Sequence, residues 1–209
     1  WMGPMMSSTV AVPFPRTLAD AVLPRAGFLH DALLVLCASA LTAIAAQLAA
    51  PVPWSPVPLT GQTFAVVLTG TLLGPRRAFL AQFLYLAEGA MGLPVFAGGA
   101  GGWLRLIGPT GGYLFSFPLA AALCGALAGR GWDRRFWTTF AAMMAGSAVI
   151  LASGLVGLMA YLPGEMLLPS GLYPFLPGDV IKSALAALAL PTAWRRLERA
   201  PDPPRSTVP

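Results

Sequence analysis

The chain carries little charge, because only 10% of its 209 residues are Asp, Glu, Lys or Arg. Soluble domains carry charge on about a quarter of their residues, so the composition excludes an ordinary soluble domain. The two cysteines, Cys37 and Cys124, fall within apolar stretches, and neither a CxxC motif nor a Cys/His cluster occurs. The single histidine, His30, precedes the first expected helix and is interpreted as a solvated residue, so no metal site is expected.

Catalytic signatures are also missing. The phosphate-binding pattern G-x-x-x-x-G-K-[ST] requires a lysine after a glycine-rich loop, whereas the single lysine, Lys182, follows GDVI. A serine nucleophile needs a histidine base, and metal-assisted chemistry needs clustered acids, but the eight Asp and Glu residues are scattered. We therefore expect no enzyme, no catalytic residue and no cofactor.

Hydrophobic residues make up 56% of the chain, and the mean hydropathy is +0.71. Most of the apolar stretches approach the ~20 residues that cross a bilayer core as a helix. They cover residues 31–50, 57–73, 78–94, 110–129, 136–161 and 178–194. The expected fold is an all-α membrane protein with six transmembrane helices, in contact with lipid on its outer faces.

The basic residues predict the orientation of these helices. Eleven of the 13 fall on one side of a six-helix topology: Arg16, Arg25, Arg76, Arg77, Arg130, Arg134, Arg135, Arg195, Arg196, Arg199 and Arg205. Positive loops face the cytoplasm, so we expect both termini there, in a multi-pass protein of the cytoplasmic (inner) membrane. The calculated pI near 9.9 then reflects orientation, and no nucleic-acid partner is expected.

The chain divides into three expected parts. Residues 1–30 comprise WMGP, interpreted as a cloning remnant, and a cytoplasmic or interfacial segment. Residues 31–194 form the six-helix transmembrane domain, whose pocket we expect at the outer side beneath long loops. Residues 195–209 form a basic cytoplasmic tail.

Two cations, Arg105 and Lys182, remain unexplained by orientation. Asp179 precedes Lys182 by three residues, so both side chains lie on one face of an expected helix and can converge on one ligand. Ionisable groups at the edge of the hydrocarbon normally face the bundle interior or a wet cavity. In the alternative reading, Asp179 caps its helix and Lys182 extends to the membrane surface.

The outer loops supply further candidate ligand contacts. The segment GLPVFAGGAGGWLRLIGPTGGY, residues 92–113, is rich in glycine and contains Phe96 and Tyr113. The polar groups of its backbone cannot lie unsatisfied against lipid. We therefore expect this segment to be a lid that covers a flat organic ring. The alternative is a flexible surface loop.

Three more side chains belong to this candidate site. Trp54, in the proline-rich loop 51–64, is predicted to stack on a ligand or to anchor the chain at the interface. Gln62 begins the following helix. Glu88, late in the stretch 78–94, either lines the pocket or forms an ion pair with Arg105.

Four sequence blocks together resemble a known family. They are VPLTGQTF…LTGTLLGPRRA, YLAEGAMGLPVFAGGAGG, GPTGGYLFSF and PFLPGDVIK, in this order and across nearly all of residues 33–190. They resemble BioY, the biotin-binding S-component of energy-coupling factor (ECF) transporters. Several blocks in register make the resemblance specific.

The resemblance implies a six-helix subunit that captures biotin from outside and works with a transmembrane coupling protein and paired ATPases. It places an Asp and a Lys of the last helix in the ligand site, here Asp179 and Lys182. Asp179 suits the ureido N–H groups, while Lys182 and Arg105 suit the carbonyl or carboxylate. The alternative is an autonomous facilitated or ion-coupled biotin transporter, with Asp179 and Glu88 as candidate proton sites.

Family S-components dock on their partners through small residues of the first helix. The segment CASALTAIAAQLAA has small residues at four-residue spacing, which permits close helix approach. The expected interface residues are Ser39, Ala43, Ala45 and Ala49. In the alternative, this face packs inside the subunit or against a second copy of the chain.

Overall fold

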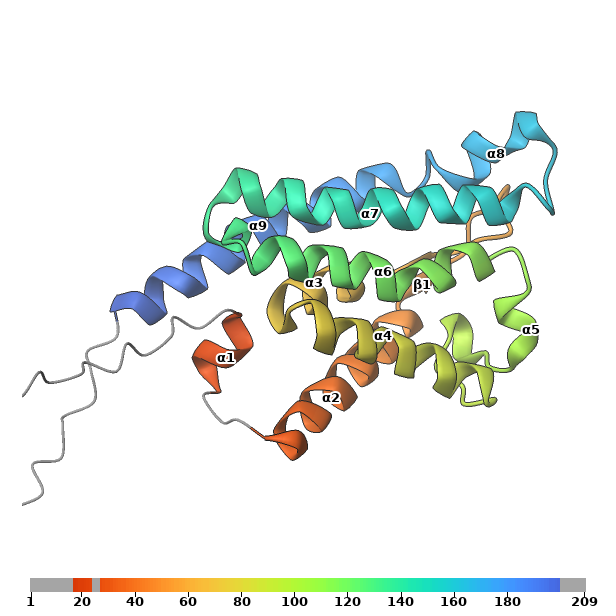
Figure 1. Cartoon of the computed structure of the whole chain (residues 1–209). Coiled ribbons are helices and arrows are strands. Elements are labelled where there is room, and N and C mark those ends of the chain that lie inside the picture. The colour runs from red at the N-terminus through yellow and green to blue at the C-terminus, as the bar shows by residue number, and fades with distance from the viewer. Residues whose placement is uncertain (1–16, 24–26, 200–209) are drawn as a thin grey trace, which may run out of the picture.

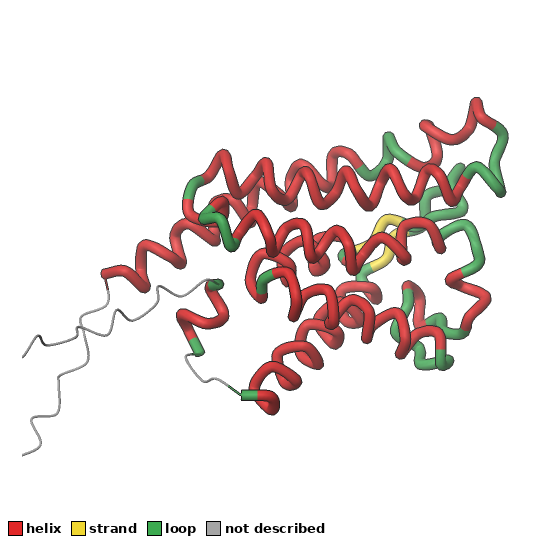
Figure 2. Tube along the Cα trace, viewed as in Figure 1, coloured by secondary structure: helices red, strands yellow, loops and turns green. Residues whose placement is uncertain are grey.

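The computed structural model describes residues 17–23 and 27–199, which are mostly helical (Figures 1 and 2). The elements are α1 (Leu18–Val22), α2 (Phe28–Gln47), β1 (Ala49–Ala50), β2 (Leu59–Thr60), α3 (Gln62–Leu73), α4 (Pro75–Ala90), η1 (Ala97–Gly99), α5 (Trp103–Leu106), α6 (Gly111–Ala128), η2 (Trp132–Arg134), α7 (Phe136–Leu158), α8 (Gly164–Gly171) and α9 (Leu176–Arg199). WMGP, Arg16, Arg25 and Arg205 lie outside the described residues.

Each of the six expected stretches overlaps one of the six longest described helices, namely α2, α3, α4, α6, α7 and α9. Helix α3 begins at Gln62, five residues after the expected start at residue 57, and α9 ends at Arg199, five residues after the expected end at residue 194. Pro56 and Pro58 lack the N–H that a helix interior needs and disfavour helical geometry in the residues before them. Residues 59–60 instead form β2, which pairs antiparallel with β1 and adds a short ladder to the expected all-α fold.

Three of these helices, α2, α6 and α7, are long and apolar enough to cross a membrane. Helix α3 has 12 residues. At a rise of about 1.5 Å per residue it is roughly 18 Å long, short of a hydrocarbon core of about 30 Å. The protein is therefore a helical membrane protein with three clear spanning candidates among its described helices.

Helix α6 lies at the centre of the bundle, beside α7 and α3 (Figure 1). Its contact with α7 depends on Gly112 and Gly157, because a Cβ on Gly112 would come within 2.6 Å of the Ser153 carbonyl oxygen. Its contact with α3 depends in the same way on Gly70, where a Cβ would come within 2.5 Å of the Ala121 carbonyl oxygen. Small residues let helix backbones approach closely, which is how membrane helices gain packing contacts without a hydrophobic driving force.

The bundle has two different ends (Figure 1). The basic end carries α1, the start of α4, η2 and the last turns of α9, with the arginines predicted to face one side. The loop end carries the β-pair, η1, α5 and α8, and α5 and α8 are short helices that the sequence analysis does not predict. His30 was expected before the first helix, but α2 begins at Phe28, so this residue lies in its first turn.

Candidate ligand-binding pocket

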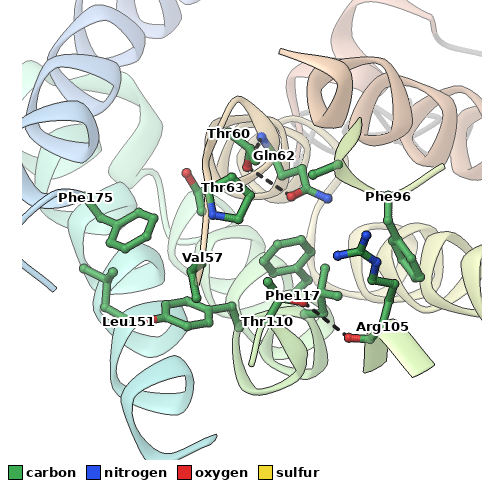
Figure 3. Close-up of a pocket in the computed structure, with 14 residues that line it drawn as sticks. Val57, Thr60, Gln62, Thr63, Phe96, Arg105, Thr110, Phe117, Leu151 and Phe175 are labelled. Carbon is green, nitrogen blue, oxygen red and sulfur yellow. Dashed lines mark hydrogen bonds between the residues drawn. The ribbon is translucent and has the colours of Figure 1, made fainter. Parts of the chain in front are cut away.

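A cavity of about 80 Å³ lies at the loop end, between α3, α5, α6 and α7 (Figure 3). Its apolar wall includes Val57, Phe96, Tyr113, Phe117, Leu151 and Phe175, and its polar wall includes Thr60, Gln62, Thr63, Arg105 and Thr110. Small-molecule sites combine a mostly apolar lining with a few placed polar groups in this way.

Gln62 is fixed at the start of α3 by bonds on both sides of its amide. Its Oε1 accepts a hydrogen bond from Thr60 Oγ1 at 3.0 Å, and its Nε2 donates to the Tyr85 hydroxyl. Tyr85 in turn donates to the Val95 carbonyl at 3.1 Å. This chain of bonds joins β2, α3 and α4 to the loop that carries Phe96, so the polar wall and the Phe96 wall are held together.

Arg105 is the one charged side chain among the described residues that line the cavity. It belongs to the four-residue helix α5, and its backbone carbonyl accepts a hydrogen bond from Thr110 Oγ1 at 3.3 Å. Figure 3 shows its guanidinium group directed into the space between Phe96 and Phe117. It forms no ion pair within residues 17–23 and 27–199, so its charge is available to an anionic group of a ligand.

Asp179 and Lys182 contact two of the threonines of the polar wall, Thr60 and Thr63. Asp179 Oδ1 accepts a hydrogen bond from Thr63 Oγ1 at 3.3 Å. Lys182 Nζ donates to the Thr60 carbonyl at 3.0 Å and to Thr63 Oγ1 at 3.3 Å. Both side chains of α9 therefore turn inward to the wall of the cavity, and Lys182 does not extend to the membrane surface.

Asp179 and Lys182 nevertheless form no direct ion pair, although they are one helical turn apart. Asp179 is only 3% exposed, and its Oδ2 has no partner among the described residues. It lies in the first turn of α9, and no described backbone N–H donates to its carboxylate, so it is not acting as a helix cap. A buried carboxylate oxygen without a partner is costly unless a donor reaches it, so Asp179 is suited to receive one from a ligand.

The model of the BioY family matches residues 10–199 of the chain. The chain belongs to the BioY family. A probable biotin transporter BioY of Pyrococcus horikoshii is 38% identical over 149 residues, which cover 71% of this chain and 86% of the relative. The biotin transporter BioY of Thermotoga maritima is 42% identical over 138 residues, which cover 66% of this chain and 80% of that protein.

A solved structure is also similar. It is a crystal structure of the S-component for biotin from an ECF-type ABC transporter, with a TM-score of 0.69 and 27% sequence identity. The match covers 83% of this chain and 93% of that chain. BioY is a family of transporters, so this chain is not an enzyme.

The structure separates the other predicted site residues of this BioY chain into two groups. Phe96 and Tyr113 line the cavity, and the Tyr113 hydroxyl donates to the Gly171 carbonyl at 2.7 Å. Trp54 is outside the cavity lining, is exposed, and donates from Nε1 to the Pro169 carbonyl at 3.3 Å. It fastens the first loop to α8.

Glu88 also lies away from the cavity. Its Oε2 accepts a hydrogen bond from Ser39 Oγ at 2.6 Å, between α4 and α2. It forms no ion pair with Arg105 in the described chain. A hydrogen bond between α2 and α4 explains this carboxylate without a ligand.

The four predicted interface residues, three in α2 and Ala49 in β1, do not share one free surface. Ser39 is fully buried against Glu88, and Ala49 pairs with Thr60 in the β-ladder. Ala45 packs on Gly61, where a Cβ would come within 2.8 Å of the Ala45 carbonyl oxygen, and Ala43 is half-buried. The small-residue face is thus largely used in contacts within the described chain.

The structure adds lining residues that the sequence analysis does not single out, including Thr63, Phe117, Leu151 and Phe175. Thr63 had a signal, because TGQT places a polar cluster just before an apolar run. The other three are apolar residues among apolar neighbours. Nothing in such a pattern marks which of them borders a cavity.

Proposed function

We propose that this chain captures biotin from outside and delivers it across the cytoplasmic membrane as the S-component of an ECF-type ABC transporter. The observation that carries the proposal is the cavity, whose lining includes Arg105, without an ion pair among the described residues, and two threonines that bond to Asp179 and Lys182. The family membership and the similarity to an S-component for biotin identify the vitamin.

The arrangement of charges matches the two ends of biotin. Asp179 is buried and its Oδ2 has no partner among the described residues, so the ureido N–H groups bind at the Thr63 and Asp179 side. Arg105 is at the exposed rim, so it binds the carboxylate. Phe96 and Phe117 pack against the apolar part of the ligand between them.

The cavity is small for such a ligand. Its volume is about 80 Å³, whereas pockets for small molecules typically measure roughly 300–1,000 Å³. Entry of biotin therefore requires movement of the wall, and the glycine-rich segment 92–110, which includes Arg105, is a part of the wall outside the long helices.

The orientation follows from the two ends of the bundle. In the proposed topology α2, α3, α4, α6, α7 and α9 all cross the membrane, with both termini in the cytoplasm and the cavity on the outer side. The described arginines of the basic end support this orientation because positive loops face the cytoplasm. Helix α3 reaches across only together with the extended residues before it.

Calorimetry of the purified chain with biotin and with other vitamins tests the substrate. Among these vitamins, the wild type is expected to bind only biotin with high affinity. Asp179→Asn and Lys182→Ala are each expected to weaken biotin binding at least tenfold. Glu165→Gln, an exposed carboxylate of α8 outside the cavity lining, is the matched control and should bind as the wild type does. Undiminished affinity in both site variants would contradict the proposed site.

The partnership with a coupling protein and ATPases is a separate part of the proposal. Four apolar residues of α2 lie on one exposed stripe, which we call the α2 stripe: Leu33, Leu36, Ala40 and Ile44. It is the exposed side of the helix that the family uses for docking. We expect Ala40→Trp to impair assembly with the partners and Ser39→Ala to leave it intact, with biotin binding preserved in Ala40→Trp.

Liposomes containing the purified chain distinguish this function from autonomous transport. Binding of biotin without accumulation supports the capture subunit, and accumulation without ATPase partners supports an autonomous transporter. In that alternative, Asp179 and Glu88 are the ionisable side chains within membrane helices that could exchange a proton. Light scattering shows whether Ala40→Trp still associates with a second copy of the chain. This measurement separates self-association through the α2 stripe from docking on the partners.

A further inference from the structure

Gln47 is the last residue of α2 and stands at the loop end of the α2 stripe. The stripe is apolar up to Ile44, and Gln47 follows it at helical spacing with an exposed amide side chain. The ordinary explanation for a polar residue at this position is that it lies at the membrane interface and bonds only to water. The hydrogen bonds of Gln47 indicate a different explanation.

Both polar atoms of the Gln47 amide are used within the chain. Its Oε1 accepts a hydrogen bond from the Gly99 N–H at 3.0 Å, and its Nε2 donates to the Phe96 carbonyl at 3.2 Å. Nε2 also donates to the Ala43 carbonyl of its own helix at 3.0 Å, which holds the side chain in place. Within the part of the chain that the structure describes, no other α2 side chain forms a hydrogen bond with the 96–100 turn.

The 96–100 turn is a small closed unit. The Phe96 N–H donates to the Ala100 carbonyl at 2.9 Å, and Gly98 and Gly99 have φ angles of 70° and 68° that let the backbone reverse. The turn therefore moves as one piece, and a restraint on Gly99 is also a restraint on Phe96.

Phe96 forms one wall of the cavity and is only 3% exposed. Its ring meets the ring of Tyr85 edge to face, with centroids 5.5 Å apart, and it fits because Gly89 has no Cβ to overlap with it. The backbone position of the turn thus decides whether this ring closes the cavity.

Helix α4 fastens the chain on either side of the turn. The Tyr85 hydroxyl donates to the Val95 carbonyl at 3.1 Å, and the Gly102 N–H donates to the Gly89 carbonyl at 2.7 Å. The turn between these two points is bonded to Gln47. Loss of Gln47 would leave residues 96–100 free to swing about the two anchors on α4.

We propose that Gln47 is a latch: it holds the 96–100 turn closed so that Phe96 covers the cavity, and it sets how long a bound ligand stays. Gln47 acts through Phe96 and does not itself line the cavity, so it is a positioning residue. The part concerning biotin rests on the proposed function, whereas the closure of the turn does not.

The kinetic experiment compares three variants with the wild-type chain by rapid-mixing measurements of biotin association and dissociation. Gln47→Ala removes both bonds to the turn and is expected to speed dissociation about tenfold, as for the loss of two neutral hydrogen bonds. Because the turn then opens more often, association also becomes faster, and Kd rises by less than the dissociation rate does. Gln47→Glu keeps the acceptor for Gly99 and loses the donor to Phe96, so its dissociation rate is expected to be intermediate.

Ile44→Ala is the matched control, because it shortens an exposed side chain one turn earlier on the α2 stripe. It should leave both rates unchanged. A dissociation rate of Gln47→Ala equal to that of the wild type overturns the latch, whatever the effect on thermal stability.

Amide hydrogen exchange tests the latch without any ligand. In Gln47→Ala, exchange at Gly99 is expected to be at least tenfold faster than in the wild type, while exchange at Gly102, which is bonded to α4, is unchanged. Unchanged exchange at Gly99 contradicts the latch. If the wild type binds no biotin, the proposed function fails, and the exchange result still decides whether Gln47 closes the turn.

Discussion

The two ends of the bundle are fastened by different chemistry. At the basic end ion pairs join separate helices: Arg77 pairs with Asp20 at 2.5 Å and with Asp31 at 2.7 Å, joining α1, α2 and α4. Arg134 pairs with Glu198 at 3.4 Å, and its guanidinium lies 4.3 Å from the centre of the Trp194 ring.

At the loop end the described residues form no ion pair, and the contacts between the loops run from uncharged side chains to backbone carbonyls. Ser55 Oγ donates to the Ser170 carbonyl at 2.7 Å, and Ser170 Oγ donates to the Trp54 carbonyl at 3.0 Å. Tyr113 and Tyr161 donate to Gly171 and Ile107 in the same manner. The bonds join segments more than 40 positions apart, so they determine how the loops lie over the cavity.

This difference gives a reason why Arg105 forms no ion pair among the described residues. Paired carboxylates around the cavity would compete for the cation that we assign to the ligand, whereas hydroxyl and indole groups bonded to carbonyls do not. Charge pairs at the basic end have no such cost, because no ligand group is expected there. The comparison predicts that substitutions at the loop end change affinity, while those at the basic end change stability.

The largest effect is expected from Arg105→Ala. Loss of one charge-assisted hydrogen bond, worth about 1.5–3 kcal/mol, should raise the Kd for biotin roughly ten- to hundredfold. Thermal stability should change little, because Arg105 is exposed and its side chain has no ion pair among the described residues. Titration calorimetry measures the first and thermal unfolding in detergent the second.

Arg130→Ala is the control, since it removes an exposed arginine of the basic end. It should bind biotin with the wild-type Kd. Equal losses of affinity in the two arginine variants would mean that the overall charge of the protein, and not the position of Arg105, attracts the ligand.

Arg77→Ala should show the opposite pattern. It separates α1 and α2 from α4 and should lower the free energy of unfolding by about 1 kcal/mol, because both ion pairs are partly exposed and such pairs are weak. Its Kd for biotin should stay within twofold of the wild type. A large loss of affinity would show that the two ends are coupled and would break the comparison.

Ser55→Ala tests the uncharged fastening of the loops. Ser55 Oγ also accepts the N–H of Val57 at 3.1 Å, so its loss loosens a residue of the cavity wall. The Kd for biotin should rise about threefold to fivefold, as for one neutral hydrogen bond. Thr192→Val removes a hydroxyl that bonds only to Leu188 within α9, and it should leave the Kd unchanged.

The smallest effect is a pH dependence of the basic end. Burial alone would raise the pKa of Asp20, but hydrogen bonds from Arg77 and Thr17 outweigh it, so this pKa lies below its ordinary value. Stabilisation by Asp20 is then fully present above the unfolded pKa of about 3.9 and is lost as the pH falls through the lower folded pKa. Asp20→Asn should remove this acid-side loss, which unfolding of both proteins between pH 6 and pH 3 measures.

Asp133 at the same end shifts in the other direction. Burial raises its pKa, even though Trp194 Nε1 donates to its Oδ2 at 2.5 Å. Because the unfolded carboxyl ionises first, stability falls as the pH rises from the unfolded pKa of about 3.9 to the raised folded pKa, and stays lower above it. The pKa values of the two aspartates thus shift in opposite directions. A loss of stability in acid that Asp20→Asn removes is therefore due to Asp20 and is not a general effect of carboxylates.

Some of the fold could be predicted because hydropathy and charge are local properties. The six apolar stretches each overlap one of the six longest described helices, since uninterrupted apolar residues can only satisfy their backbone in a membrane as helices. The boundary of α3 was misjudged because Pro58 belongs to the hydrophobic stretch by composition but excludes a helix by geometry. Helices α5 and α8 are too short to leave a periodic signal.

The candidate site was predicted only in part. Arg105, Gln62, Phe96 and Tyr113 could be found because each is a polar or aromatic residue in an unusual place, and all four line the cavity. Trp54 has the same kind of signal but bonds to Pro169 outside the cavity, since the path of a proline-rich loop depends on what it packs against. The small residues of α2 indicated a close helix contact but not which helix makes it.

The sequence by itself determined that the chain is helical and membrane-embedded, which residues are out of place for their surroundings, and which family it belongs to. Only the tertiary structure decided that Asp179 and Lys182 meet at Thr63, that Glu88 binds Ser39, and that Gln47 holds the 96–100 turn. The physical reason is distance along the chain. Composition and spacing carry information about residues within a few turns of one helix. These contacts instead join residues 49 to 119 positions apart.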